Sequence, residues 1–182
     1  ACTATVTNPV SEKPILSITN ELDKTLNVSP GSTVTYTVKA TNTGPAAAPN
    51  MFVALSAPDP ATGLASITWT CVPPTAPQGI ACSEVTFDNT DPNAPIAKLA
   101  NPVPVGSFVT LKGVAVVSTT LQSDDSVSLK ATDGTNPAVH DCHVTTTCEA
   151  TATFKVTKPE LKITNQVLPS SQVAPGSGVT YT

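Results

Sequence analysis

Apolar and polar residues alternate in several short segments of this chain. Residues 33–41 carry Val, Tyr, Val and Ala at every second position, with Thr and Lys between them. The same alternation recurs in residues 126–132 and 150–157. A period of two turns successive side chains toward opposite faces, as in an antiparallel strand with one buried face. These segments therefore predict half-buried strands.

Five further apolar segments predict additional strands. They are residues 16–21, 51–55, 65–71, 80–87 and 108–117. The last has apolar side chains on both faces, which predicts a central strand or a bulge near Gly113. Residues 88–104 are rich in Pro and predict a loop with at most a short edge strand. About eight or nine strands without a helical period favour an all-β, immunoglobulin-like antiparallel β-sandwich.

The end of the chain repeats a segment near its start. Residues 13–37 and 158–182 are identical at 14 of 25 positions, at a constant offset of 145. Self-similarity at a fixed period indicates a repeat array, and a period of 145 is the size of a whole domain. We therefore expect the last strand of a preceding repeat in residues 1–12, a complete immunoglobulin-like repeat in 13–157, and the first strands of the following repeat in 158–182.

The connection between repeats is predicted to be short and stiff. The sequence Thr-Lys-Pro-Glu of residues 157–160 separates the last strand of one repeat from the first strand of the next. Four residues leave neighbouring domains little freedom to tumble, and the Pro stiffens the segment further.

The five cysteines fit this repeat. Cys2 matches Cys148 at an offset of 146, so its partner is expected in a preceding repeat. A complete repeat then holds four, and four cysteines allow three connectivities. Local pairing, Cys71 with Cys82 and Cys142 with Cys148, is favoured because Cys71 and Cys82 flank a Pro-rich turn and would face each other across a hairpin. An even number per repeat indicates disulfides and an oxidising, extracellular compartment.

Composition argues against several functions. All nine basic residues are Lys, without a cluster, and the net charge is −4, so no nucleic-acid partner is expected. No apolar run approaches the roughly 20 residues of a spanning helix, so no membrane insertion is expected in this segment. The sequence contains no nucleophile elbow, phosphate-cradling loop or recognisable carboxylate pair. We therefore predict no enzyme, no catalytic residue and no cofactor.

Two groups of polar residues have metal-ligand chemistry but the wrong spacing. His140, Cys142, His143 and Cys148 supply zinc-ligand types, yet strand alternation turns His143 away from Cys142. Asp-rich segments such as residues 88–91 carry the oxygen ligands that calcium prefers, but their spacing matches no recognised calcium-binding loop. Asp is also an ordinary turn residue. The sequence therefore predicts no metal site.

Residues 28–46, VSPGSTVTYTVKATNTGPA, are followed by WTC at 69–71 and GIAC at 79–82. These segments resemble the bacterial and archaeal surface repeats known as conserved domain of unknown function eleven, and the resemblance covers most of residues 13–157. It implies tandem arrays on large secreted or wall-attached proteins, without a known enzymatic activity. Members often carry Lys late in the first strand. This chain has Asn20 there, so we expect no isopeptide role for that position.

These features together predict a structural repeat of an extracellular or cell-surface stalk or filament, with disulfide-stapled domains joined in series by short Pro linkers. Its expected partners are neighbouring repeats of the same chain, or identical chains. Two alternatives stay open. One is an adhesin-type binding module that uses loops such as residues 88–104. The other is a fimbrial subunit that exchanges the strands at its two ends.

Overall fold

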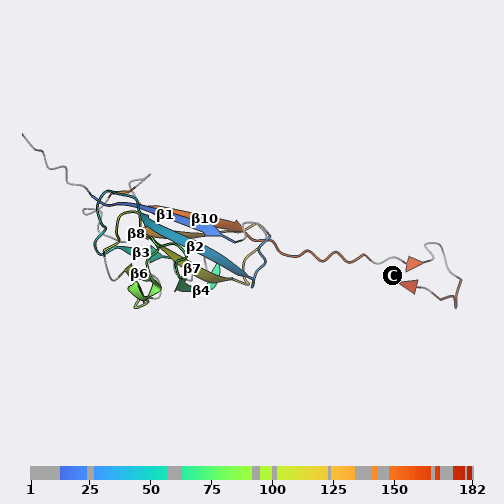
Figure 1. The fold of residues 1–182 in the computed structure, drawn as a ribbon. Coiled ribbons are helices and arrows are strands. Elements are labelled where there is room, and N and C mark those ends of the chain that lie inside the picture. The colour runs from blue at the N-terminus through green and yellow to red at the C-terminus, as the bar shows by residue number, and fades with distance from the viewer. Residues whose placement is uncertain are drawn as a thin grey trace, which may run out of the picture.

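The structure is a computed structural model. It describes residues 13–23, 27–56, 63–91, 95–99, 102–122, 124–133, 141–142, 148–164, 167–168, 174–178 and 180–181. Two five-stranded sheets pack face to face as a β-sandwich (Figure 1), and the predicted all-β, immunoglobulin-like fold class is confirmed. A single 3-10 turn, Cys82–Glu84, is the only helical element among the described residues.

The first sheet has the strand order β4-β7-β2-β1-β9. Its strands are β4 Leu64–Cys71, β7 Phe108–Val117, β2 Thr33–Asn42, β1 Ile15–Leu22 and β9 Asp141–Cys142. All neighbouring strands are antiparallel except β1 and β9, which run parallel. The sheet therefore joins segments from both ends of residues 13–157.

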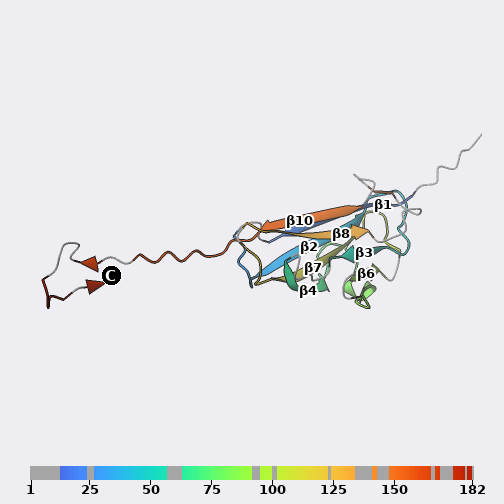
Figure 2. The same ribbon diagram turned by 180° about the vertical axis from the view of Figure 1, so that it is seen from behind.

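The second sheet has the order β10-β8-β3-β6-β5, and its neighbouring strands are all antiparallel. Its strands are β10 Glu149–Lys155, β8 Ser126–Asp133, β3 Phe52–Leu55, β6 Ile96–Leu99 and β5 Val85–Asp88. Figure 2 shows β10, β8, β3 and β6 of this sheet from behind.

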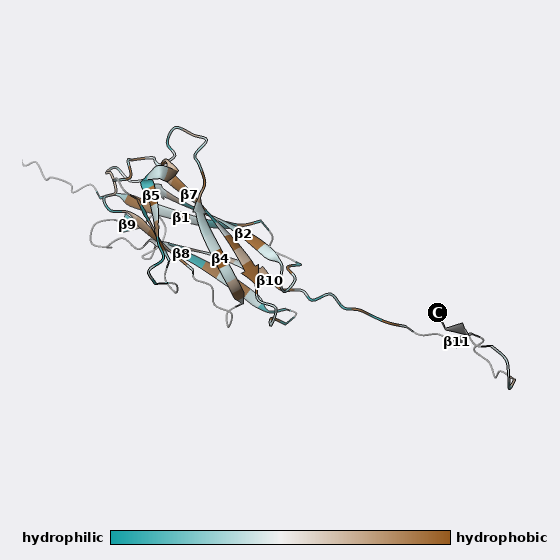
Figure 3. Ribbon diagram, turned by 90° about the horizontal axis from the view of Figure 1, so that it is seen from below, coloured by the Kyte–Doolittle hydropathy of each residue, from teal (hydrophilic) through white to brown (hydrophobic). Residues whose placement is uncertain are grey.

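The period of two seen in the sequence determines which residues form the core. In β2, Val34, Tyr36, Val38 and Ala40 are fully buried, whereas the Thr and Lys residues between them lie on the outer face. Figure 3 shows the same alternation of apolar and polar positions along the strands. The core divides into two clusters along the sandwich, one around Leu16, Met51 and Leu111, the other around Tyr36, Leu129 and Phe154.

Two strand predictions were wrong in part. The strand expected over residues 80–87 begins only at Val85, because residues 82–84 form the 3-10 turn. Residues 88–104 were expected to hold at most an edge strand, but β6 lies between β3 and β5, so β5 is the edge. The prediction failed because the prolines on either side suggested a loop, and the strand alternation of β6 extends over only four residues.

Strand β7 is central, as its apolar residues predicted, but Gly113 is not a bulge. Gly113 pairs regularly with Tyr36 on one side and Trp69 on the other. A Cβ at Gly113 would lie 2.7 Å from the Trp69 ring, so glycine is required here to accommodate the indole. The register irregularity lies instead on β4, between Leu64 and Ser66.

The first and last strands of the sandwich lead the chain from one end to the other. β1 and β10 run side by side, with β1 beginning at one end and β10 ending at the opposite end, in both Figure 1 and Figure 2. After β10, and beyond Thr157, which still bonds to the sandwich, the chain continues as an extended segment away from it. The two connections to any neighbouring domain therefore lie at opposite ends.

Candidate functional site

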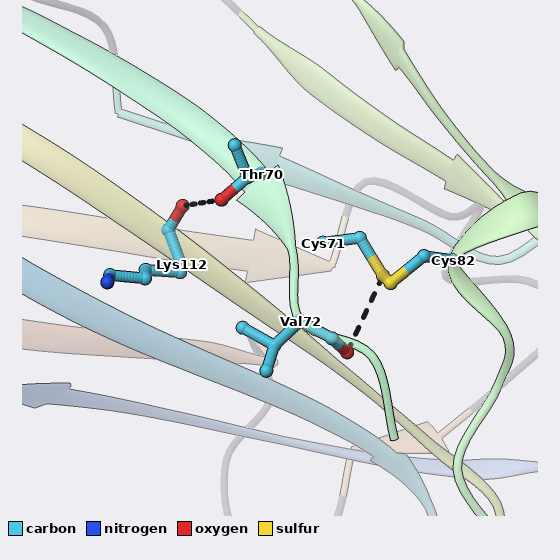
Figure 4. The surroundings of a disulfide bond; sticks show 5 residues. All are labelled: Thr70, Cys71, Val72, Cys82 and Lys112. Atoms are coloured by element: carbon cyan, nitrogen blue, oxygen red, sulfur yellow. Dashed lines mark hydrogen bonds between the residues drawn. A yellow bond between two sulfur atoms is a disulfide. The ribbon is translucent and has the colours of Figure 1, made fainter.

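The structure joins Cys71 to Cys82, with their Cα atoms 5.5 Å apart (Figure 4). Cys71 ends β4 in the first sheet, and Cys82 opens the 3-10 turn that leads into β5 of the second sheet. The bond therefore links the two sheets, and the expected hairpin was wrong. Cys71 Sγ also lies 3.7 Å from the Val72 carbonyl oxygen, a contact only, because a bonded sulfur has no proton to donate.

The segment between these cysteines explains why no hairpin forms. Ile80 N donates to Phe108 O at 2.8 Å, and Phe108 N donates to Gln78 O at 3.1 Å. Residues 78–80 thus bond to the beginning of β7, beyond the end of β4, before the chain crosses to the second sheet. Closing a loop with a sequence separation of 11 is worth about 2.8 kcal/mol in the chain-entropy model.

The second bond, Cys142 to Cys148, also crosses between the sheets. Cys142 lies on β9 beside β1, and Cys148 directly precedes β10 in the second sheet; their Cα atoms are 5.1 Å apart. Both bonds pack against the same core cluster, the one around Leu16. The sequence separation of 6 gives about 2.2 kcal/mol in the same model.

The expected partner of Cys2 cannot be placed, because Cys2 lies outside the described residues. His140 and His143 lie outside them as well. Within the described part of the chain, no group of three or more His, Cys, Asp or Glu is arranged to hold a metal ion. Cys142 and Cys148 are bonded to each other, so neither sulfur is a thiolate that could bind zinc.

The aspartates of the Asp-rich segments accept hydrogen bonds from nearby residues. Asp88 accepts hydrogen bonds from Lys98 Nζ at 2.6 Å and from Thr90 N at 3.1 Å. The Lys98 bond, followed by the Thr90 bonds, holds the pKa of the Asp88 carboxyl well below its usual range. Asp125 Oδ2 accepts from Gln122 N at 2.6 Å. The bond from Thr90 N to Asp88 is that of an ordinary Asx turn.

A buried amide bridges the sheets at a position that the sequence did not mark as structural. Asn20, on β1, donates from Nδ2 to Leu129 O of β8 at 3.0 Å. Its Oδ1 is buried and has no hydrogen-bond partner among the described residues, and the same holds for the Tyr36 hydroxyl. Burial, with a smaller contribution from the Asp23 charge, raises the pKa of Tyr36. The sequence feature that could have indicated this contact is that Asn20 is a polar residue on the inward face of β1.

Two strand lysines, Lys39 and Lys130, could take part in an intramolecular Lys–Asn isopeptide bond only if they were buried, and both lie outside the core. Lys39 is exposed, with its Nζ 4.1 Å from the centre of the Phe108 ring. Lys130 is exposed on β8 and forms an ion pair with Glu149. Neither ammonium is buried beside an amide, which is the arrangement that such a bond requires.

Main-chain hydrogen bonds hold the chain where it begins the sandwich. Asp141 N donates to Pro14 O at 2.9 Å, and Thr43 N donates to Ile15 O at 2.7 Å. Pro14 is buried. Lys13 Nζ lies 3.9 Å from Asp141 Oδ1, which makes a partly exposed ion pair. The first strand is therefore fixed from the carbonyl of Pro14 onward.

A second set of hydrogen bonds holds the chain where it leaves the sandwich. Val156 forms a parallel bridge with Val28, and Thr157 N donates to Val28 O at 2.8 Å. Val156 N donates to Asp125 O at 2.9 Å. The next residue, Lys158, donates from Nζ to Gln122 Oε1 at 2.7 Å. The last strand is therefore fixed through the amide of Thr157.

The C-terminal segment repeats the geometry of the first hairpin. Its two short strands are β11 Val167–Leu168 and β12 Thr180–Tyr181. Val167 pairs with Tyr181, and the residues 145 positions earlier, Leu22 and Tyr36, pair in the same way. The two copies therefore share one strand register.

The turns of the two hairpins also correspond. Ser32 N donates to Ser29 O at 3.1 Å, and Ser177 N donates to Ala174 O at the same distance. These two bonds are again 145 positions apart.

The two copies differ in burial. Leu16 is 1% exposed, whereas its counterpart Leu161 is 83% exposed. Ile18 packs against the core, whereas its counterpart Ile163 is 80% exposed. The apolar positions of this extended segment are visible in Figure 3. An extended segment with alternating apolar residues is thus presented to solvent without the sheet that buries its counterpart.

No protein-family model matches this chain, and no curated protein matches it. Among solved structures, the major pilin subunit BcpA of Bacillus cereus is similar with a TM-score of 0.50 and 12% identity, over 84% of this chain and 41% of the pilin. A point variant of that pilin has a TM-score of 0.51 and 11% identity, over 79% and 40%. The CARDB domain of a Pyrococcus furiosus protein, in complex with di-metal ions, has a TM-score of 0.46 and 14% identity, over 82% and 97%.

The chain spans about two fifths of the length of the pilin. At these identities the likeness establishes the sandwich fold alone. In the described residues, no helix has the length and apolar character needed to cross a membrane.

Proposed function

We propose that residues 13–157 are one structural repeat of a secreted or cell-surface stalk or filament, in which disulfide-stapled immunoglobulin-like domains follow one another in one chain. The observation that carries this proposal is the recurrence of the first hairpin after the last strand. Its sequence, strand register and turn hydrogen bond all recur at an offset of 145. The resemblance to the surface repeats of the conserved domain of unknown function eleven agrees with it.

The proposed mechanism is the transmission of tension along the strands. The chain enters at β1 and leaves after β10 at the opposite end, so a pull between neighbours acts along the strand axes. The seven pairs that join β1 to β2 then share the load in shear, because β1 must slide past β2 as a whole. The two disulfides keep the sheets together around the core cluster next to the start of β1.

This proposal assigns no catalytic activity to the repeat. Its four described cysteines are bonded in pairs. Asp88 and Asp125 accept hydrogen bonds within their own turns. These particular groups are thus engaged in holding the fold.

Single-molecule stretching of the native chain tests the stalk. We expect regular unfolding steps of equal length, because each repeat has the same size. Reduction should lengthen every step by about 50 Å. It frees two segments of 11 and 6 positions, at about 3.5 Å per residue, whose end Cα atoms the bonds already hold 5.5 and 5.1 Å apart. A single step, or steps of irregular length, would contradict the proposal.

A second function, a fimbrial subunit that lends its C-terminal strands to another copy, is favoured by one observation. Leu161 and Ile163 are exposed on an extended segment, although their counterparts pack in the core. Such a segment could replace β1 of another copy. We rank it second because β1 already occupies that place in the described structure.

A further inference from the structure

We propose that the disulfide between Cys142 and Cys148 is a load-bearing bond, which couples the strand where the chain enters the sandwich to the strand where it leaves. The bond between Cys71 and Cys82 has no such role. The inference rests on the proposed function, in which tension acts along the strands, and it assigns different tasks to the two bonds. It follows from the places of the four cysteines in the two sheets.

The two strands that receive the pull are not bonded to each other. β1 lies in the first sheet and β10 in the second, so no ladder joins these two strands. Seven pairs join β1 to β2 and two join it to β9, while seven pairs join β10 to β8. Because the chain enters and leaves at opposite ends, tension draws β1 and β10 past each other in opposite directions (Figures 1 and 2).

The Cys142–Cys148 bond connects the two sheets between these strands. Cys142 lies on β9 and pairs with Leu16 of β1, and Cys148 directly precedes β10. β9 lies at the end of the sandwich away from the exit of the chain (Figure 3). When β10 is pulled toward the exit, the bond draws β9 with it, while β1 is pulled the other way. The β9–β1 pairs, together with the bond from Asp141 N to Pro14 O at 2.9 Å, then resist the movement.

Without the disulfide, β9 would not resist the movement. β9 is the edge strand of its sheet and pairs only with β1, so it would travel with β1. The six positions between the cysteines extend to about 21 Å, at about 3.5 Å per residue, whereas the bond holds their Cα atoms 5.1 Å apart. After reduction, β10 could therefore slide by about 16 Å before the chain pulled on β9. A slip of one residue, about 3.3 Å, already breaks the register of β10 with β8.

The Cys71–Cys82 bond lies away from the loaded strands. It joins the end of β4 to the turn before β5, and β4 and β5 are the edges of the two sheets farthest from β9 and β10. Two strands separate β4 from β1, and three separate β5 from β10. Tension reaches this bond only after the ladders nearer the load have failed. At equilibrium the order of the two bonds is reversed, because the bond that closes the longer loop stabilises the fold more.

The test stretches the full 182-residue chain by its two ends, with one disulfide removed at a time. If strand pairs share the load equally, Cys142→Ser with Cys148→Ser should lower the mean unfolding force by about a fifth, because two of the nine pairs that hold β1 no longer act. Cys71→Ser with Cys82→Ser should leave the force unchanged. The unfolding step should lengthen by about 16 Å in the first variant and by about 33 Å in the second, which identifies the missing bond. Equal forces, or a larger fall in the second variant, would overturn the inference.

A partly reduced wild-type chain gives the same comparison without a variant that has to fold. Brief reduction of the folded protein opens one bond or the other, and the step length of each molecule shows which bond is open. Molecules with the shorter extra step should unfold at the lower force, and the reverse order would contradict the proposal. The comparison is made within one domain. A native chain without regular steps would therefore overturn the tandem arrangement and leave this result intact.

Variants of Asp141 test the β9–β1 pairing with both disulfides intact. Asp141→Pro removes the N–H that donates to the Pro14 carbonyl, so it should lower the unfolding force without changing the step length. Asp141→Ala is the matched control, since it keeps this N–H and loses only the partly exposed ion pair with Lys13. The control should unfold at the wild-type force. Equal effects of the two variants would contradict a load on β9.

Discussion

The two copies of the first hairpin are identical at 14 of 25 positions but have very different surroundings. Residues 13–37 form β1 and the start of β2 in the sandwich, where Leu16 is 1% exposed. The apolar residues Leu16 and Ile18 recur in the second copy as Leu161 and Ile163, which are 83% and 80% exposed. Both copies nevertheless have the same register and the same turn hydrogen bond.

The difference shows which properties of the hairpin are local. The turn and the register are determined by nearby residues, because Gly31 and Gly176 both adopt a positive φ, +78° and +86°. Burial is not local, since it requires the opposite sheet. Fully burying a leucine side chain is worth about 1.5–3 kcal/mol, which the C-terminal copy gains only when the rest of a domain is present.

The largest expected effect comes from truncating Leu16, compared with the same change at its counterpart Leu161. Leu16→Ala should lower the free energy of unfolding by about 2–5 kcal/mol, because it removes a buried side chain and leaves a cavity. Leu161→Ala should change it by less than about 0.5 kcal/mol, as a surface substitution does. Denaturant unfolding of this 182-residue chain measures both. Similar losses from the two variants would show that the C-terminal copy already packs on a domain.

The next effect concerns the disulfide beside the first strand. Replacing Cys142 and Cys148 by Ser should lower stability by about 2.2 kcal/mol, and replacing Cys71 and Cys82 by about 2.8 kcal/mol. Only the first pair adjoins β1, through β9. The amide hydrogen-exchange rates of residues 15–16 should therefore increase more in the Cys142 and Cys148 variant than in the other, after correction for the loss of global stability. Equal local exchange in both variants would argue against this role.

A smaller effect tests whether the turns are equivalent. Gly31→Ala places a side chain at a positive φ and should cost about 1–2 kcal/mol of global stability. The new methyl group has room, since its nearest neighbour is Thr119 Cγ2 at 3.5 Å, so the cost is conformational. Gly176→Ala should leave global unfolding unchanged but remove the NMR signature of β11 and β12. Loss of global stability from Gly176→Ala would contradict the local account of the turn.

The smallest effect concerns the buried hydroxyl of Tyr36. Tyr36→Phe should change stability at pH 7 by less than about 1 kcal/mol, because the hydroxyl has no partner among the described residues. Burial raises the pKa of Tyr36, so the folded state retains the proton that the unfolded state loses above about pH 10. Stability should therefore fall as the pH rises above 10, by at most about 1.4 kcal/mol per pH unit. Parallel unfolding curves of both proteins from pH 8 to 11 test this, since Tyr36→Phe should fall less steeply.

Local patterns in the sequence predicted most strands but not how the sheets are joined. The alternation in β2 identified its four buried apolar residues, because strand faces depend only on period. The structure joins Cys71 to Cys82 and Cys142 to Cys148, and both bonds cross between the sheets. That outcome depends on residues 78–80 bonding to Phe108, a contact between distant segments that leaves no trace in the spacing of Cys71 and Cys82.

The amide contact of Asn20 could not be predicted for the same reason. Its acceptor, Leu129 O, is 109 positions away on another sheet. Likewise, β6 has only four residues between prolines, and its interior position is decided by pairing with β3 and β5. Features that depend on pairing between distant strands could therefore be identified only in the structure.

The mass of the native full-length chain, measured from the source material under denaturing and reducing conditions, tests the central claim most directly. The account predicts a single chain many times larger than the 18.5 kDa of these 182 residues, since each repeat continues into the next. A native chain near 18.5 kDa would contradict the covalent array, and the exposed C-terminal copy would then have to pack against another molecule.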